Sequence, residues 1–350
     1  MNTFIDPKAI NNNRYEWIDY AKGIAIILVV FRHVIVGIHL ADFNVPDLYY
    51  QTIVEFGVNS RMPLFFILSG LFFSRSIMKR SRNGYFMHKL KSIMYPYLVW
   101  SVIQMTLQII LSDYTNEGHD VSGYLLILYK PRGQFWFLYA LFNIGTIYLL
   151  LHRAFKGNHW LLIFTGLLFY LIVPYLNAGK LIYDICRLFI FFVIGDVLAQ
   201  AFSKSSTQNI LADNRIFIAL LVSFFAIEYC LFNFEVFHLL TAFFAMIGVF
   251  FFISLAIKVS RINNHPLLFL RIIGYHSMYI FLLHALISAA VRIFFKHIII
   301  VENVFFIHAL GTLAGVLGPI IFYSITLNFG WNFLFYPPSL SKAERGKVKA

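Results

Sequence analysis

The chain has 350 residues, of which 60% are hydrophobic and only 13% are charged, and its formal net charge is +12. A soluble globular domain is usually about 45 to 50% apolar, so this composition excludes an ordinary soluble enzyme and indicates an integral membrane protein. The basic residues flank apolar segments, which argues against a nucleic-acid-binding protein. Cys186 and Cys230 both fall within apolar segments, so we expect neither a disulfide framework nor a bound metal.

Apolar segments fill most of the chain and are cut by Gly, Pro, Asn and charge clusters. A membrane-crossing helix needs about 20 mostly apolar residues. The sequence therefore predicts an all-α membrane protein, a bundle of about ten transmembrane helices. We place these spans at 19–40, 57–73, 92–112, 133–151, 159–177, 181–201, 216–233, 238–258, 275–296 and 304–327.

The distribution of Lys and Arg predicts the orientation, because cytoplasmic loops are enriched in these residues. With the N-terminus inside, 20 of the 28 basic residues lie on the cytoplasmic side. The prediction is a cytoplasmic segment at 1–18, one transmembrane domain at 19–327 and a basic cytoplasmic tail at 328–350, so both termini are cytoplasmic. The first span is full length and lacks a small-residue cleavage site, which predicts an uncleaved anchor. We expect a multi-pass protein of the inner (plasma) membrane.

The first span, "YEWIDYAKGIAIILVVFRHV", carries ionisable residues inside an apolar run. Lys22 and His33 share one helical face about 16 Å apart, and Asp19 lies within about 40° of it, whereas Arg32 is about 80° away. Ionisable groups at such depth usually face a bundle interior or cavity at a functional site. Because histidine readily takes a proton near neutral pH, His33 is a candidate base. Alternatively, Asp19 and Lys22 form an interfacial ion pair, and His33 hydrogen-bonds a neighbouring helix.

Two later spans add polar residues. The ninth, "YHSMYIFLLHALISAAVRIFF", places Ser277, His284 and Ser288 within about 40° of one another, so a second helix presents a buried histidine. The second, "NSRMPLFFILSGLFF", contains Arg61 and a Ser69-Gly70 pair, which is also typical of close helix packing. No serine lies in a nucleophile-elbow pattern. Other ionisable residues in or near the spans have no spacing that we can interpret: Arg187, Asp196, Glu228, Arg292 and His308.

Five sequence blocks occur in order over nearly the whole chain: "WIDYAKGIAIILVVFRH", "RMPLFFILSG", "YPYLVW", "QFWFLYALF" and "YIFLLHALI". They resemble the successive blocks of the membrane-bound acyltransferase-3 family, whose signature of a basic residue, ten others and a histidine corresponds here to Lys22 and His33. The variety with "DYAKG" and "MPLFFILSG" is similar to the fucose 4-O-acetylase-like branch, a group of polysaccharide O-acetyltransferases. Region 19–327 would then be an acyltransferase-3-like transmembrane domain.

The resemblance implies that an acyl group, usually acetyl from cytoplasmic acetyl-CoA, is transferred to a hydroxyl of a cell-surface or lipid-linked glycan of the cell envelope. His33 would be the essential histidine and Lys22 its basic partner, and we add Asp19 and His284 as catalytic candidates. The candidate substrate-binding residues, Arg61, Ser69 and Trp136, lie in the same blocks.

Two departures from the family pattern stand out. The family often has an Arg-x-x-Arg pair after the second span, whereas "HKLKSIMYPY" offers His88, Lys89 and Lys91, and Arg32 stands where the branch commonly has glycine. We therefore assign the phosphates of acetyl-CoA to the cations of the 74–91 loop, although the positive-inside rule explains the same charges. These cations are Arg75, Lys79, Arg80, Arg82, Lys89 and Lys91.

Other functions are compatible with the same residues. Buried histidines and carboxylates also form the proton relays of transporters, so a proton-coupled exporter of a saccharide is the alternative from another class. An acyltransferase with another donor, such as succinyl-CoA, or with an amino-group acceptor is a further one. The expected partners are an acyl-CoA, a glycan or lipid-linked saccharide and the lipid bilayer, with no nucleic acid; a homo-oligomer is left open.

Overall fold

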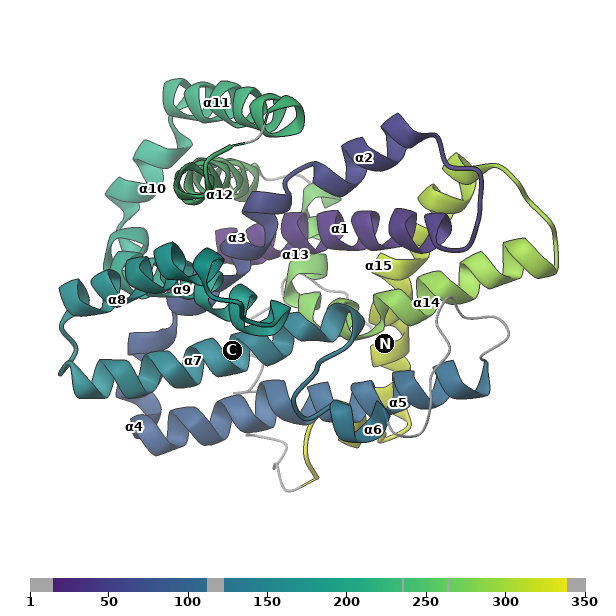
Figure 1. Ribbon diagram of the computed structural model, residues 1–350, viewed down its shortest axis with the longest axis horizontal. Coiled ribbons are helices and arrows are strands. Elements are labelled where there is room, and N and C mark those ends of the chain that lie inside the picture. Colours follow the sequence, from purple (N-terminus) through teal and green to yellow (C-terminus); the bar gives the residue numbers. More distant parts are fainter. Residues whose placement is uncertain (1–14, 112–122, 235, 263–264, 339–350) are drawn as a thin grey trace. The chain divides into compact units, whose positions relative to one another are not determined.

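The computed structural model describes residues 15–111, 123–234, 236–262 and 265–338 (Figure 1). All regular secondary structure among these residues is helical, with no strand, which confirms the all-α prediction. The chain divides into two units. Among the described residues, unit one comprises 15–58, 98–134 and 258–338, and unit two comprises 59–97 and 135–257.

Unit one is built around the first helix and the last three long helices of the chain. Helix α1 packs against α13, α14 and α15, and α14 packs along α15. The short helix α2 also lies against α1. The helices of this unit are α1 (Glu16–His39), α2 (Asp47–Glu55), most of α5 (Tyr95–Ile110), α6 (Gly123–Leu126), α13 (His265–Tyr275), α14 (Ser277–His297), α15 (Val304–Asn328) and the 3-10 helix η6 (Asn332–Leu334).

Glycines bring the helices of unit one into close contact. A Cβ on Gly274 of α13 would lie only 1.6 Å from the carbonyl oxygen of Asp19, and one on Gly23 would lie 2.3 Å from that of Leu270. On α15, a Cβ on Gly315 would lie 2.5 Å from the Ser288 hydroxyl oxygen of α14. Small residues allow membrane helices to approach in this way. The glycines therefore let the backbones of neighbouring helices pack closely around α1.

Unit two contains the middle helices of the chain. Its elements are most of α3 (Val58–Gly70), α4 (Phe73–Lys89), the π-helix η2 (Leu90–Met94), α7 (Trp136–Ala154), α8 (His159–Ile172) with η5 (Val173–Tyr175), α9 (Lys180–Ser203), α10 (Ser205–Ala212), α11 (Asn214–Asn233) and most of α12 (His238–Ser260). The 3-10 helix η4 (Gly133–Phe135) precedes α7 and crosses the boundary between the two units along the chain. Helix α9 packs against α7 and α8. Gly70 of α3 and Gly195 of α9 meet, since a Cβ on either would lie 2.2 Å from a carbonyl oxygen of the other helix.

Seven helical stretches of the described chain are long and apolar enough to cross a membrane, and they coincide with seven of the ten predicted spans. They are Glu16–His39, Phe73–Ile110, Gly133–Ala154, Asn214–Asn233, His238–Ser260, Ser277–His297 and Val304–Asn328. The other three predicted spans fall on α3, on α8 with η5, and on α9. Helices of 13 and 14 residues, such as α3 and α8, are about 20 Å long, shorter than a hydrocarbon core of about 30 Å. The count of ten and the orientation therefore stay predictions.

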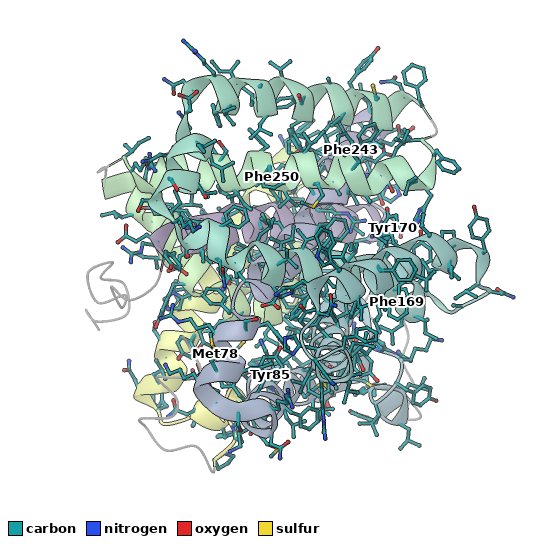
Figure 2. The ribbon with its side chains drawn as sticks, turned by 90° about the vertical axis from the view of Figure 1, so that its left-hand side faces the viewer. Met78, Tyr85, Phe169, Tyr170, Phe243 and Phe250 are labelled. Atoms are coloured by element: carbon teal, nitrogen blue, oxygen red, sulfur yellow. The ribbon has the colours of Figure 1, made fainter. Side chains whose placement is uncertain are left out.

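The segment that we expected to be a basic loop, 74–91, is helical. It forms α4 and the start of η2, with one break at Ser81, where φ is +63°. Lys, Arg and Met favour helices, and the buried Phe73 and Tyr85 anchor α4 in unit two while its cations stay at or near the surface. Figure 2 labels Met78 and Tyr85 on this helix.

Candidate active site

Two histidines from opposite ends of the sequence meet in unit one. The ring centroids of His33 on α1 and His284 on α14 are 5.1 Å apart, with the ring planes at 60°. His33 is half-buried, whereas His284 is fully buried. Both were predicted from separate spans as candidates for one cavity, and the structure brings them together. We call them the histidine pair.

The hydrogen bonds of the histidine pair fix where each ring carries its proton. His33 Nδ1 lies 2.8 Å from the Val29 carbonyl oxygen, and His284 Nδ1 lies 2.9 Å from the carbonyl oxygens of both Ile280 and Phe281. A carbonyl only accepts, so Nδ1 donates in both rings and the lone pair of each neutral ring is on Nε2. The buried His284 Nε2 has no hydrogen-bond partner within the described residues. The pair can therefore accept a proton, which a general base requires.

The Ser288 hydroxyl, one turn after His284, serves helix packing instead. It donates a hydrogen bond to the Gly311 carbonyl oxygen of α15 at 3.1 Å and faces Gly315. The arrangement joins α14 to α15, so Ser288 lacks the free hydroxyl of a nucleophile.

Another buried histidine of unit one, His308 on α15, is held at both nitrogens. Its Nε2 donates to the Phe31 carbonyl oxygen at 2.9 Å, and its Nδ1 accepts from the Tyr49 hydroxyl of α2 at 2.6 Å. Burial raises the pKa of the Tyr49 hydroxyl, so it stays protonated and can donate. His308 therefore has no lone pair left for catalysis and joins α15 to α1 and α2.

The other polar residues of α1 lie toward its start. Asp19 is fully buried where α1 meets Gly274 of α13, and Lys22 is half-buried. His33 follows Lys22 by three turns, about 16 Å along the helix. An ion pair missed by the sequence interpretation lies nearby: the buried Arg271 of α13 binds Glu16 at 2.8 Å. These contacts fix the start of α1 against α13.

Arg32, the residue that departs from the branch pattern, is tied to α2. Its Nε donates to the Val54 carbonyl oxygen at 3.3 Å. Arg292, a cation on α14, makes no hydrogen bond or ion pair within the described part of the chain, and its guanidinium lies against Gly37 of α1. Sequence spacing offers no reason to connect residues 37 and 292, because they are far apart along the chain.

The predicted substrate-binding residues all lie in unit two. Arg61 is buried on α3, Ser69 is half-buried beside Gly70, and Trp136 is half-buried at the start of α7. The contact of Gly70 with α9 supports the packing interpretation of the Ser69-Gly70 pair. A small pocket in this unit is lined instead by neighbouring positions, including Asn59 and Pro63 of α3, Tyr170 of α8 (labelled in Figure 2), Arg187 of α9 and Thr241 of α12.

The predicted donor-binding cations lie on α4 and η2. Arg75, Lys79 and Arg82 are exposed, whereas Arg80, Lys89 and Lys91 are half-buried. Arg80 donates to the Ser76 hydroxyl at 3.3 Å, and the Lys89 ammonium lies 5.5 Å from the centre of the Tyr85 ring. The exposed face of α4 is thus basic and free to meet anionic groups.

The start of α4 is fixed by a buried carboxylate that the sequence did not connect with it. Asp196 of α9 accepts from the Ser74 amide at 3.1 Å and the Ser74 hydroxyl at 2.6 Å through one oxygen, and from the Tyr148 hydroxyl at 2.8 Å through the other. A carboxylate at a helix N-terminus satisfies free amides and complements the helix dipole. We call Asp196, Ser74 and Tyr148 the α4 anchor.

Comparison with known proteins agrees with the five sequence blocks. Residues 15–324 match the sequence model of the acyltransferase domain of the acyltransferase-3 family, a match that begins just before α1 and ends within α15. No curated protein and no solved structure matches the chain. The chain therefore belongs to the acyltransferase-3 family of membrane acyltransferases.

Proposed function

We propose that this protein is an O-acetyltransferase of the inner membrane that moves an acetyl group from cytoplasmic acetyl-CoA to a sugar hydroxyl of a cell-surface or lipid-linked glycan. The histidine pair carries the proposal: two neutral imidazoles with Nε2 lone pairs meet inside an apolar helix bundle. The family match supports the reaction class, and the resemblance to the fucose 4-O-acetylase-like branch supports the donor and the acceptor.

In the proposed reaction, Nε2 of His33 accepts the proton of the acceptor hydroxyl. The hydroxyl oxygen attacks the thioester carbonyl carbon, so a C–O bond forms and the C–S bond breaks. The departing thiolate takes the proton from the His33 imidazolium, which leaves an acetyl ester and free coenzyme A and restores the neutral ring. His284 holds the His33 ring edge-to-face and acts as a positioning residue. Lys22 and Asp19 lie on α1 toward its predicted cytoplasmic end, and we retain them as catalytic candidates on the basis of the family signature and the shared helical face.

We assign coenzyme A to the exposed face of α4. The cofactor carries a pyrophosphate and a further phosphate, and the six cations of α4 and η2 can pair with them. The α4 anchor supports this assignment, since it fixes the end of the basic helix. For the acceptor we retain Arg61, Ser69 and Trp136, on the basis of the family blocks alone.

The test is acetyl transfer by the purified full-length protein from acetyl-CoA to glycans extracted from cells that lack it, detected by mass spectrometry. His33→Ala should lower turnover by about 10²- to 10⁴-fold, the usual contribution of a general base, without loss of the folded state in detergent melting. His308→Ala is the matched control: it removes a buried histidine of the same unit whose nitrogens are both bonded, so it should lower stability but keep the turnover per folded molecule. Wild-type turnover by folded His33→Ala would reject the assignment, and an unchanged acetyl profile of surface glycans in cells without the protein would reject the proposed function.

A further inference from the structure

Arg292 lies in an apolar helix without a compensating charge. It is half-buried on α14, two turns after His284, and forms no hydrogen bond or ion pair with any other described residue. A guanidinium stays charged in a protein, and a charge inside a membrane segment usually marks a functional site. An anion is the ligand that would compensate it.

The guanidinium lies close to the histidine pair. A Cβ on Gly37 of α1 would come within 2.4 Å of the Arg292 Nη1, and Gly37 lies one turn, about 6 Å, beyond His33. Side chains on a helix lean toward its N-terminus. Along the axis of α14, the guanidinium of Arg292 therefore lies nearer to His284 than the Arg292 backbone does. Gly37 thus leaves the space that the guanidinium occupies, and the charge lies about one turn from the proposed base.

The charges around Arg292 are positive. No Asp or Glu occurs in α14 or α15, and the acidic residues of α1, Glu16 and Asp19, lie at its other end. The acids in the connections and on α2 are Asp42, Asp47, Glu55 and Glu302, none of which pairs with Arg292. Lys296, one turn further along α14, is a second cation and donates to the Ala41 carbonyl oxygen at 2.6 Å. With the predicted orientation these cations are at the outer end, so the positive-inside rule does not account for them.

We propose that Arg292, seated on Gly37, is an anion-binding site beside the histidine pair, and that it holds a phosphate or carboxylate of the sugar acceptor. The inference rests on the proposed function and names its acceptor class: a saccharide that bears an oxyanion. A guanidinium binds either group through two parallel hydrogen bonds. Arg292 would thereby place the acceptor hydroxyl within reach of His33, as a specificity-determining residue.

Binding to the purified full-length protein tests the site without any turnover. The probes are glucose 1-phosphate, glucuronate and glucose, with dissociation constants measured by calorimetry. Wild-type protein should bind at least one of the two anionic sugars more tightly than glucose, and the tighter one identifies the preferred group. Arg292→Gln should weaken that binding by about tenfold or more, as expected for a lost charge-assisted pair, and Arg292→Lys should retain part of it. Lys296→Gln, a neighbouring cation on the same helix, should leave it unchanged.

Two further measurements guard the interpretation. Gly37→Ala keeps the charge but takes the space of the guanidinium, so it should also weaken anionic binding, with melting curves to confirm folding. Saturating coenzyme A should not displace the anionic sugar; displacement would assign the oxyanion to the donor and overturn the acceptor assignment. Unchanged affinity in folded Arg292→Gln, or equal binding of glucose, would overturn the site. If anionic sugars bind through Arg292 but no acetyl transfer occurs, the proposed function fails while the anion site stands.

Discussion

Among the described side chains of unit one, four histidines are buried or half-buried: His33, His276, His284 and His308. In His33 and His284 a backbone carbonyl holds Nδ1 and directs the lone pair to Nε2, whereas His308 has both nitrogens bonded to protein groups. Chemical type alone therefore does not select the base. The partners of the ring nitrogens set His308 apart, whereas His276 has the same Nδ1 contact with a backbone carbonyl as His284. The contact between the rings of His33 and His284 distinguishes the histidine pair.

The bond between Tyr49 and His308 gives a prediction at this scale. Tyr49→Phe leaves a buried imidazole nitrogen without its donor, which should lower the free energy of unfolding by about 1 to 3 kcal/mol, measured by detergent melting. Tyr50→Phe is the control, since Tyr50 stacks on His39 and its hydroxyl makes no hydrogen bond to another described residue. Burial raises the pKa of Tyr49 in the folded state. The stability that the protonated hydroxyl contributes to the folded state is therefore fully present below the unfolded pKa of about 10 and is lost as the pH rises through the folded pKa. A difference between wild type and Tyr49→Phe that vanished at neutral pH would contradict the assignment.

Sequence periodicity was sufficient to place Lys22 and His33 on one face of a helix and to mark His284 as a second buried histidine. It could not predict that the two rings meet, because helical spacing relates only residues within one segment. The same limit hid Arg292 beside Gly37 and Asp196 beside Ser74: each partner comes from a distant helix. Contacts of this kind depend on how helices pack, which a single sequence does not encode locally.

At the scale of elements, α4 shows how a basic stretch between apolar segments can itself be a helix. The charge pattern suggested a loop, yet buried Phe73 and Tyr85 and the α4 anchor hold it in unit two. Seven of the predicted apolar runs of about 20 residues coincide with helices that are long and apolar enough to cross a membrane. The same rule cannot show whether a shorter apolar helix such as α3 crosses the bilayer, because packing against protein also favours apolar residues.

The exposed cations of α4 give the second prediction. Replacing Arg75, Lys79 and Arg82 by Gln should raise the KM for acetyl-CoA with less effect on kcat, the pattern of binding lost equally in the ground and transition states. The assay is steady-state acetyl transfer at varied donor concentration. Arg153→Gln with Lys156→Gln, two exposed cations at and just after the end of α7, is the control and should leave KM unchanged. An unaltered donor KM in the triple variant would leave the α4 cations with no role beyond orientation.

At the scale of the molecule, the distribution of exposed apolar residues agrees with a membrane setting. Helix α11 exposes Ile218, Val222 and Phe225 by 56%, 62% and 53%, side chains that lipid tails would cover. Burial in lipid also explains why composition identified the class of protein at once, since both the inside and the outside of such a bundle are apolar.

The predicted orientation gives the third prediction. In a variant with Cys186 and Cys230 replaced by Ser, a cysteine at Met78, which is 80% exposed on α4, should resist a membrane-impermeant maleimide in intact cells. Cysteines at Leu48 and Tyr129, which are 69% and 62% exposed in the predicted external loops, should react. Permeabilised cells provide the control, in which all three should be labelled. Labelling of the Met78 position in intact cells would reverse the orientation and place the α4 cations outside.

The packing of α1 between α13, α14 and α15 has a consequence for biosynthesis. Helix α1 leaves the ribosome before α13, which begins about 225 residues later, a delay of about 10 to 45 s at about 5 to 20 residues per second. During that interval the carboxylate of Asp19 and the ring of His33 lack the neighbours that enclose them in the finished protein. The newly inserted helix must wait in the bilayer with its polar side uncovered, so a membrane chaperone or early-made helices of the same chain would have to shield it until translation ends.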